Sequence, residues 1–262
     1  MAYKVVIHSP KGGQGKTTIT ANLSIMLAEK DYNVLVIDGC SSRQFQNYFN
    51  VKAEHGVFDF LSGTPLHNLI GELRKNLYLL PAGDLVKAER FLDEDKISPI
   101  SKVEERLKEY EEEFDFIIFD TAPNEDTRFF FNVLHYIDCI ITPIETKRAG
   151  FDKTIDFRDL IDGINPRLRE PFGKEPLQID ILIPYWFDKR VGSKQGILEL
   201  IKEEFEEVSL LTEPIRECDG IHLCWGESQS LSERLSGKRK PPSNEAQMLK
   251  IFQSIVDYLI ME

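Results

Sequence analysis

Short apolar runs separated by glycine-rich and polar stretches predict a strand, a turn and a helix at the start of the chain. Residues 5–7 are all apolar and are typical of a buried strand. Polar and glycine residues follow, and apolar residues then recur at helical spacing between Thr18 and Lys30. We expect a helix that starts near Lys16 and packs on a sheet.

The same alternation continues to the end of the chain. Apolar runs that indicate buried strands alternate with helical patterns, as in a parallel sheet covered by helices. The predicted strands span residues 33–38, 114–123, 138–144, 178–184 and 208–215, and the predicted helices span residues 99–114, 127–136, 150–163, 195–205 and 248–260. The sequence shows no repeat and no separable second domain. We therefore expect one doubly wound α/β domain over residues 1–262, with a mostly parallel sheet flanked by helices.

Three of the predicted helices have polar or aromatic residues whose surroundings must be interpreted. Helix 99–114 is acidic, and we take its run of glutamates at 111–113 as a solvated face. The aromatic helix 127–136 is interpreted as packed on the sheet, with a dimer or partner surface as the alternative. Helix 248–260 has an apolar face but no basic polar face, so we predict core packing rather than membrane binding.

The first turn has the composition of a phosphate-binding loop. Gly12, Gly13 and Gly15 permit backbone angles and close approaches that a side chain would prevent. Their N–H groups can turn toward a polyphosphate at the positive end of the following helix. In this arrangement Lys16 would reach the β- and γ-phosphate oxygens, and the Thr17 hydroxyl would bind Mg²⁺.

Two predicted strands end in a carboxylate. Asp38 follows the apolar residues 34–37, and Asp120 follows the apolar residues 116–119 in what reads as a Walker B strand. Because ligands of open α/β sheets bind at the carboxyl ends of the strands, both side chains are candidates for the Mg²⁺ site. A strand-end residue that merely caps a turn is the alternative for Asp38.

Composition limits the partners and the class of protein. The chain has 262 residues, with 42% hydrophobic and 29% charged residues, as in soluble globular proteins. Its net charge of −12 opposes indiscriminate binding to DNA or anionic lipid, so any such contact needs a local basic patch. The four cysteines form no Cys-x-x-Cys pair, and we expect reduced thiols. We expect no signal peptide, no membrane-spanning segment and a cytoplasmic location.

The residues Lys-Gly-Gly-Gln-Gly-Lys-Thr-Thr at 11–18 form a deviant Walker A motif, which carries a lysine at its start. Here the chain resembles the ParA/MinD family of P-loop ATPases, and most closely its ParA-type partition members. The resemblance implies that ATP and Mg²⁺ bind at Lys11, Gly12, Gly13, Gln14, Gly15, Lys16, Thr17 and Thr18, with Asp38 and Asp120 at the metal. It also implies that Lys11 reaches across an ATP-dependent homodimer to the partner's nucleotide, and that Lys11, Lys16 and Asp38 serve catalysis.

The chain departs from the family pattern after the strand at 33–38. The family usually carries Asp-x-Asp there, and its second Asp helps to position the attacking water. That position is Cys40 here. A neutral thiol is a poor base, so we expect hydrolysis to be slow or dependent on a partner. The family's proline after the Walker B strand is also replaced, by Ala122.

Later segments resemble the family more weakly. Residues 76–83 look like a family strand, and the resemblance makes Pro214 and Arg216 weak candidates for contacts near the adenine. Two small basic clusters are candidates for binding nonspecific double-stranded DNA, with ordinary solvated charge as the alternative. They consist of Lys189, Arg190 and Lys194, and of Lys238, Arg239 and Lys240.

The function implied by the resemblance is an ATPase that dimerises with ATP, binds DNA nonspecifically, and segregates or positions a plasmid, chromosome or other cargo. Such binding to DNA would associate the cytoplasmic protein with the nucleoid. A ParB-like or other activator protein would stimulate hydrolysis, and no stable membrane anchor is expected. A MinD-like membrane positioner and a nucleotide-binding scaffold with negligible turnover are the alternatives. A metabolic or metal-cluster enzyme of the same ATPase class is disfavoured because the chain has no cysteine pair.

Overall fold

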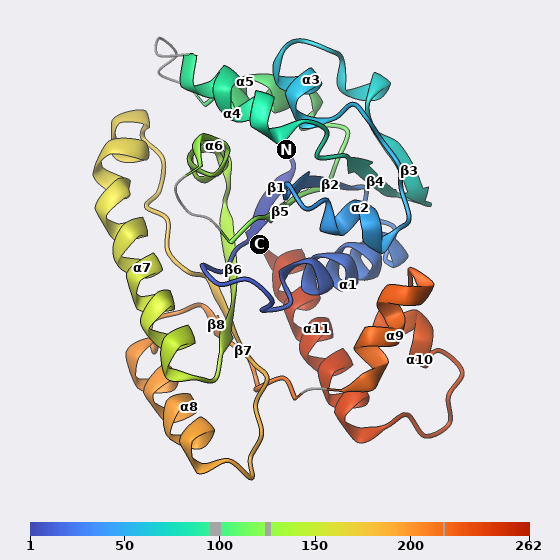
Figure 1. Ribbon diagram of the computed structural model, residues 1–262, viewed down its shortest axis with the longest axis vertical. Helices are drawn as coiled ribbons and strands as arrows, with labels where there is room; N and C mark the ends of the chain where they lie inside the picture. The colour runs from blue at the N-terminus through green and yellow to red at the C-terminus, as the bar shows by residue number, and fades with distance from the viewer. Residues whose placement is uncertain (95–100, 124–126, 217) are drawn as a thin grey trace.

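A central sheet with helices on both faces organises the chain. The computed structural model describes residues 1–94, 101–123, 127–216 and 218–262 (Figure 1). Within these ranges, eight strands lie side by side in the order β3-β4-β2-β5-β1-β6-β7-β8. They are β1 (Tyr3–Ile7), β2 (Val34–Gly39), β3 (Gly71–Arg74), β4 (Leu77–Leu80), β5 (Phe116–Thr121), β6 (Cys139–Glu145), β7 (Ile181–Tyr185) and β8 (Leu210–Leu211).

Every pair of neighbouring strands is parallel except β3 with β4. This arrangement confirms the predicted α/β fold with a doubly wound, mostly parallel sheet. The carboxyl ends of the central strands meet at one edge, where the register sets Ile7 beside Asp120 and Asp120 beside Asp38. Side chains that follow these strands are therefore brought together, although they are up to about a hundred residues apart in the sequence.

The helices divide between the two faces of the sheet. They are α1 (Lys16–Glu29), α2 (Gln44–Tyr48), α3 (Val57–Leu61), α4 (Leu85–Glu94), α5 (Lys102–Leu107), α6 (Arg128–Tyr136), α7 (Arg148–Leu168), α8 (Gly192–Glu204), α9 (Asp219–Glu227), α10 (Leu231–Leu235) and α11 (Ser243–Met261). Short 3₁₀ turns lie at Leu66–Asn68, Lys108–Tyr110 and Glu170–Phe172.

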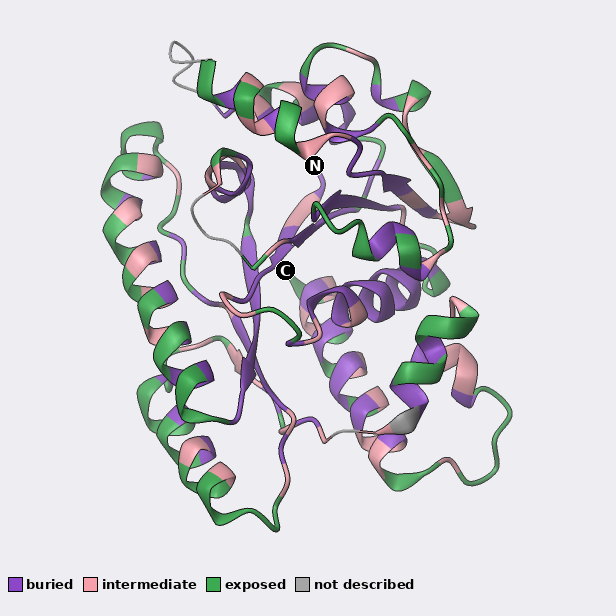
Figure 2. Ribbon diagram, in the orientation of Figure 1, coloured by how far each residue is buried: buried purple, intermediate pink, exposed green. Residues whose placement is uncertain are grey.

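Two apolar cores lie on opposite faces of the sheet. One contains side chains of α3 to α8, and the other contains side chains of α1, α2, α9, α10 and α11. Figure 2 shows the buried strands between these helical layers and the exposed outer faces of the helices. Burial of α1 is nearly complete because it lies beneath α11 and against the sheet.

Two of the helix interpretations are confirmed. In α6, Phe129, Phe130, Val133 and Leu134 are buried, so this helix packs on the sheet. In α11, most of the apolar residues predicted to face the core are buried, among them Ile251, Phe252 and Ile255, whereas Leu249 and Ile260 are half-buried. The interpretation of the glutamate run is wrong at one position, because Glu111 is buried and accepts a hydrogen bond of 2.7 Å from the Tyr136 hydroxyl.

Several predicted bounds also differ from the structure. The helix predicted over 150–163 extends from Arg148 to Leu168, past Pro166 in its last turn, and the strand predicted over 208–215 contains only Leu210–Leu211. The helix predicted to start at residue 99 begins at Lys102, and its first predicted residues lie partly outside the described ranges. The edge strand β3 and the helices α4, α9 and α10 were not predicted.

Candidate nucleotide-binding site

The predicted phosphate loop lies between β1 and α1, at the edge where the central strands end. Gly13 and Gly15 have φ angles of 76° and 83°, which are unfavourable for residues with side chains. A Cβ at Gly15 would lie 2.9 Å from the ring of Tyr185 at the end of β7. Both constraints require glycine, and the turn leads directly into the first residue of α1, Lys16.

Lys16 points back over this loop. Its Nζ donates to the backbone oxygens of Ser9 and Lys11, at 3.3 and 3.4 Å. The side chain is buried, and this burial lowers the pKa of Lys16 from its usual value, while nearby Asp120 opposes the shift. An ammonium group held by weak contacts with carbonyl oxygens is suited to bind an incoming anion more strongly.

Thr17 and Asp120 meet at the start of α1. The Thr17 hydroxyl donates to Asp120 Oδ2 at 2.7 Å and lies 3.2 Å from Oε1 of Gln44, while Thr20 donates to Asp120 Oδ1 at 3.1 Å. Burial raises the pKa of Asp120 to about 6, although these hydrogen bonds oppose the shift. The structure therefore places the predicted Walker A threonine beside the predicted Walker B aspartate.

Asp38 adds a third oxygen-bearing side chain at this edge of the sheet, beside Thr17 and Asp120. It accepts hydrogen bonds from the backbone N–H of Cys40 at 3.0 Å and of Gln46 at 3.1 Å. Burial and the neighbouring Asp120 raise its pKa to about 7. Two buried carboxylates and a hydroxyl form the type of donor set that Mg²⁺ prefers. Within the described residues no group of three or more His, Cys, Asp or Glu side chains could hold a metal ion.

The Cys40 thiol occupies the position where the family pattern has its second Asp. It is buried, and its sulfur lies 2.9 Å from the Ser42 hydroxyl. This contact joins two neutral groups, so it supplies no carboxylate that could orient or deprotonate a water.

Lys11 forms an ion pair with Glu145, a residue that was not predicted. Glu145 ends β6, and its other oxygen pairs with Lys147. The carboxylate is almost fully buried, and although burial raises its pKa, the two lysines lower it below the usual value. Glu145, like Asp38 and Asp120, is a carboxylate at the end of an apolar strand. The pattern that predicted those two residues would therefore also have predicted Glu145 as a candidate.

A hollow of about 380 Å³ opens over the phosphate loop. One side is formed by residues 13–18, and Gln44, Tyr185 and Trp186 lie around it. Residues Ile221, His222 and Trp225 of α9 form the side that faces the loop. None of the residues outside the loop was predicted, because they come from distant segments without a recognisable motif.

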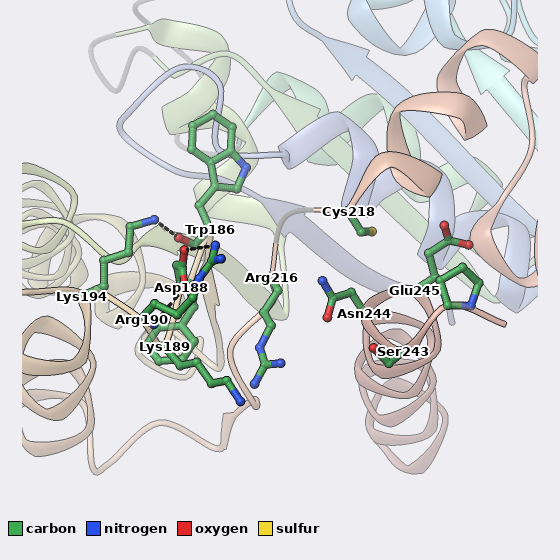
Figure 3. Close-up of a pocket in the computed structure, with 12 residues that line it drawn as sticks. Trp186, Asp188, Lys189, Arg190, Lys194, Arg216, Cys218, Ser243, Asn244 and Glu245 are labelled. Atoms are coloured by element: carbon green, nitrogen blue, oxygen red, sulfur yellow. Dashed lines mark hydrogen bonds and ion pairs between the residues drawn. The ribbon is translucent and has the colours of Figure 1, made fainter. Parts of the chain in front are cut away.

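A second, larger hollow of about 760 Å³ begins at Trp186 and is lined by many charged residues (Figure 3). Lys189, Arg190 and Lys194 lie along it, and Figure 3 shows Arg216 between this cluster and the first residues of α11. Arg190 is paired with Asp188 at 2.8 Å. The structure thus brings Arg216 to the predicted basic cluster, whereas Pro214 is half-buried beside it and is not part of the lining.

The second basic cluster lies in the loop before α11. Lys238, Arg239 and Lys240 are exposed, and the same loop reaches the large hollow through Pro242. The first predicted cluster therefore lines the large hollow, whereas the second lies in the loop that leads to it.

Comparisons with known proteins agree with this geometry. The family described as AAA domain matches residues 2–172. The chromosome-partitioning ATPase Soj from Thermus thermophilus is 30% identical over 173 residues, which are 63% of this chain and 66% of Soj. The septum site-determining protein MinD from Thermotoga maritima is 35% identical over 127 residues, which are 46% of this chain and 44% of MinD.

The chain belongs to the ParA/MinD family of P-loop ATPases. Among solved structures, apo McdA from Cyanothece has a TM-score of 0.82 at 21% identity, covering 99% of this chain and all of McdA. An ATP complex of a McdA variant has a TM-score of 0.81. At this identity the likeness shows a shared fold. The match to Soj spans slightly less than two thirds of the length of Soj.

Among the described residues, no helix combines the length and the apolar content needed to cross a membrane. The closing helix of this ParA/MinD chain also directs its apolar residues into the core beside α1.

Proposed function

We propose that this chain is a ParA-like ATPase that dimerises when it binds ATP and Mg²⁺, and that the dimer binds DNA nonspecifically. The observation that carries the proposal is the convergence of Lys16, Thr17, Asp38 and Asp120 at one edge of the sheet beside a deviant Walker A loop. Residues 1–262 would act as one ATPase domain, since all eight described strands belong to one sheet.

Each part of the nucleotide has a proposed partner. The backbone of residues 12–15 and Lys16 would hold the phosphates, and Thr17, Thr18 and Gln14 would lie beside them. Thr17, Asp38 and Asp120 would hold Mg²⁺, which when bound neutralises charge on the phosphate oxygens. Arg216 would lie toward the base and ribose, since the two hollows share Trp186.

Lys11 would exchange its partner when the dimer forms. In the monomer it pairs with Glu145, and its side chain is still 40% exposed. A lysine in this position can leave its carboxylate and reach a phosphate of a second subunit. ATP would thereby hold the dimer together, and hydrolysis would release it.

The basic clusters support DNA as the surface that the dimer binds. The chain has a net charge of −12, yet Lys189, Arg190, Lys194 and Arg216 line one hollow, and the exposed basic residues 238–240 precede Pro242 of its lining. A dimer doubles this local positive surface, which strengthens binding to a polyanion more than to a neutral partner. A cargo-bound activator would then stimulate turnover, and so segregate or position that cargo.

Cys40 supports a second candidate function, a nucleotide-binding scaffold with negligible turnover. The thiol and its Ser42 partner provide no base for the attacking water. Phosphate release measured with and without DNA separates the two functions, since a scaffold stays at background in both conditions.

The deciding experiment measures binding to nonspecific double-stranded DNA with ATP, with ADP and without nucleotide, over a series of salt concentrations. The proposal predicts binding only with ATP and Mg²⁺, together with dimer formation in sedimentation, and an affinity that falls steeply with salt. The Lys16→Ala variant should bind neither nucleotide nor DNA. Absence of DNA binding in every nucleotide state would overturn the DNA assignment, and membrane vesicles would then be the next surface to test.

A further inference from the structure

Helix α9 forms one side of the hollow of about 380 Å³ that opens over the phosphate loop, and it lies opposite that loop. Ile221, His222 and Trp225 line this hollow together with residues 13–18. These three residues are spaced as neighbours on one side of a helix. A nucleotide placed on the loop would therefore lie between the loop and α9.

The two sides of α9 have different environments. Ile221 and Cys224 are buried in the core beneath the helix. His222 and Trp225 are exposed, and Trp225 retains 37% of its surface although it lies at the hollow. Leu223 points elsewhere, since it is 48% exposed and is not part of the lining. An imidazole and an indole are thus available to a ligand at the loop.

Tyr48 connects α9 to the helix beside the metal ligands. Its hydroxyl donates to the backbone oxygen of Gln229, which follows α9, and its own backbone oxygen accepts from the Ser228 hydroxyl at 2.8 Å. Its ring packs edge-on against Trp225, with 5.0 Å between the ring centroids. The end of α9 is therefore attached to α2 by two hydrogen bonds and one aromatic contact.

The rest of α2 contacts two of the three predicted metal ligands. Oε1 of Gln44 lies 3.2 Å from the Thr17 hydroxyl, and the backbone N–H of Gln46 donates to Asp38 at 3.1 Å. If Thr17 held a metal ion, its hydroxyl oxygen would face the ion, and its contact with Gln44 would change. A helix of five residues transmits such a change readily, because its two ends are only about one turn apart.

We propose that α9 is a second wall of the nucleotide site, in which His222 donates to a phosphate oxygen and Trp225 covers the apolar part of the nucleotide, and that Tyr48 positions this wall. The proposal rests on the proposed nucleotide-binding function and adds residues to it. His222 and Trp225 are binding residues, whereas Tyr48 acts through them. The ligand class is a nucleoside triphosphate with its metal ion.

The first test measures ATP affinity by calorimetry. His222→Ala removes one hydrogen bond to a charged group, and we expect ATP binding about tenfold weaker. Trp225→Ala should weaken ATP binding by a similar factor, because apolar contact with the nucleotide is lost. The matched controls are Leu223→Ala, on the same helix outside the lining, and His55→Ala, an exposed histidine elsewhere; both should bind ATP like the wild type.

The second test uses the two tryptophans of the chain, Trp186 and Trp225, as reporters. In a Trp186→Phe background, the emission of Trp225 should change when Mg²⁺ and ATP are added. Adding Tyr48→Phe, which keeps the ring but removes the hydroxyl, should reduce this change by at least half and weaken ATP binding about threefold. Tyr78→Phe, in β4, is the control and should leave both quantities unaltered.

The outcomes separate this inference from the proposed function. If the wild type binds no ATP, the proposed function fails. If the wild type binds ATP but His222→Ala and Trp225→Ala bind it equally well, α9 is not part of the nucleotide site, and the proposed nucleotide-binding function is unaffected. If Tyr48→Phe lowers only the melting temperature and the emission change is intact, Tyr48 is structural and its positioning role is wrong.

Discussion

Asp38 and Asp120 are direct neighbours in the sheet, at matched positions of β2 and β5. Both side chains are fully buried, and burial raises their pKa values to about 7 and about 6. Two carboxylates held this close oppose ionisation, and Asp120 raises the pKa of Asp38 for this reason. The pair is therefore suited to take up a divalent ion, which would favour the charged form of both.

This relationship predicts that the metal-free protein loses stability as pH rises. Both folded-state pKa values lie above the usual 3.8 of Asp, so the folded chain retains protons that the unfolded chain releases between about pH 4 and about pH 7. The free energy of unfolding should fall through this window in EDTA. In Asp38→Asn the free energy of unfolding should depend less on pH, and at pH 8 it should be about 1–3 kcal/mol higher than in the wild type. Denaturant titrations at several pH values measure this change.

The control for this prediction is Asp162→Asn, which changes an exposed residue of α7 and should keep the wild-type pH dependence. Mg²⁺ with ATP should stabilise the wild type more at pH 8 than it stabilises Asp38→Asn. Stability that rises with pH in EDTA would contradict the assignment of raised pKa values to this pair.

The ion pair of Lys11 and Glu145 predicts a variant that dimerises more readily. Glu145→Gln removes the carboxylate that Lys11 must leave, so dimers should form with ATP at about fivefold lower protein concentration. Lys11→Ala should still bind ATP as a monomer because Lys16 remains. Sedimentation velocity at graded protein concentrations measures both effects. Asp156→Asn, at an exposed ion pair of α7, is the control, and weaker dimerisation of Glu145→Gln would show that Glu145 supports the dimer instead.

Much of the fold could be predicted because buried parallel strands are continuous apolar runs. The strands at 33–38 and 114–123 were found in this way, and their terminal carboxylates indicated Asp38 and Asp120. The edge strand β3 could not be found, since its residues Gly-Glu-Leu-Arg carry no such run and are mostly exposed or half-buried. Its antiparallel pairing with β4 depends on contacts rather than on pattern.

The nucleotide site could be predicted only where a motif spans adjacent residues. Residues 11–18 are contiguous, so spacing and residue type were enough. Helix α9 was missed because its sequence, Asp-Gly-Ile-His-Leu-Cys-Trp-Gly-Glu, contains two glycines and lacks a clear apolar stripe. Its place over the loop depends on tertiary contacts, such as the hydrogen bond from the Ser228 hydroxyl, at the end of α9, to the backbone oxygen of Tyr48 at 2.8 Å.

Cys40 predicts a simple gain of function. Cys40→Asp restores a carboxylate beside the nucleotide, and ATP hydrolysis should rise about 10- to 100-fold because a base can orient the attacking water. Cys40→Ser keeps a neutral group of similar size and should stay as slow as the wild type. Phosphate release at saturating ATP measures turnover. Equal rates for all three proteins would show that this position does not limit hydrolysis.

The exposed loop 238–240 predicts how DNA affinity depends on salt. Changing Lys238, Arg239 and Lys240 to alanine removes three positive charges from the exposed loop before α11, so the slope of log affinity against log salt should decrease by about 2 to 3. Fluorescence anisotropy with ATP and a nonspecific duplex measures this slope. The matched control changes Lys52, Lys75 and Lys108, three exposed lysines elsewhere, and gives the same net charge. Equal slopes for the two triple variants would place DNA on another surface, whereas a change confined to the loop variant would locate the phosphate contacts at the start of α11.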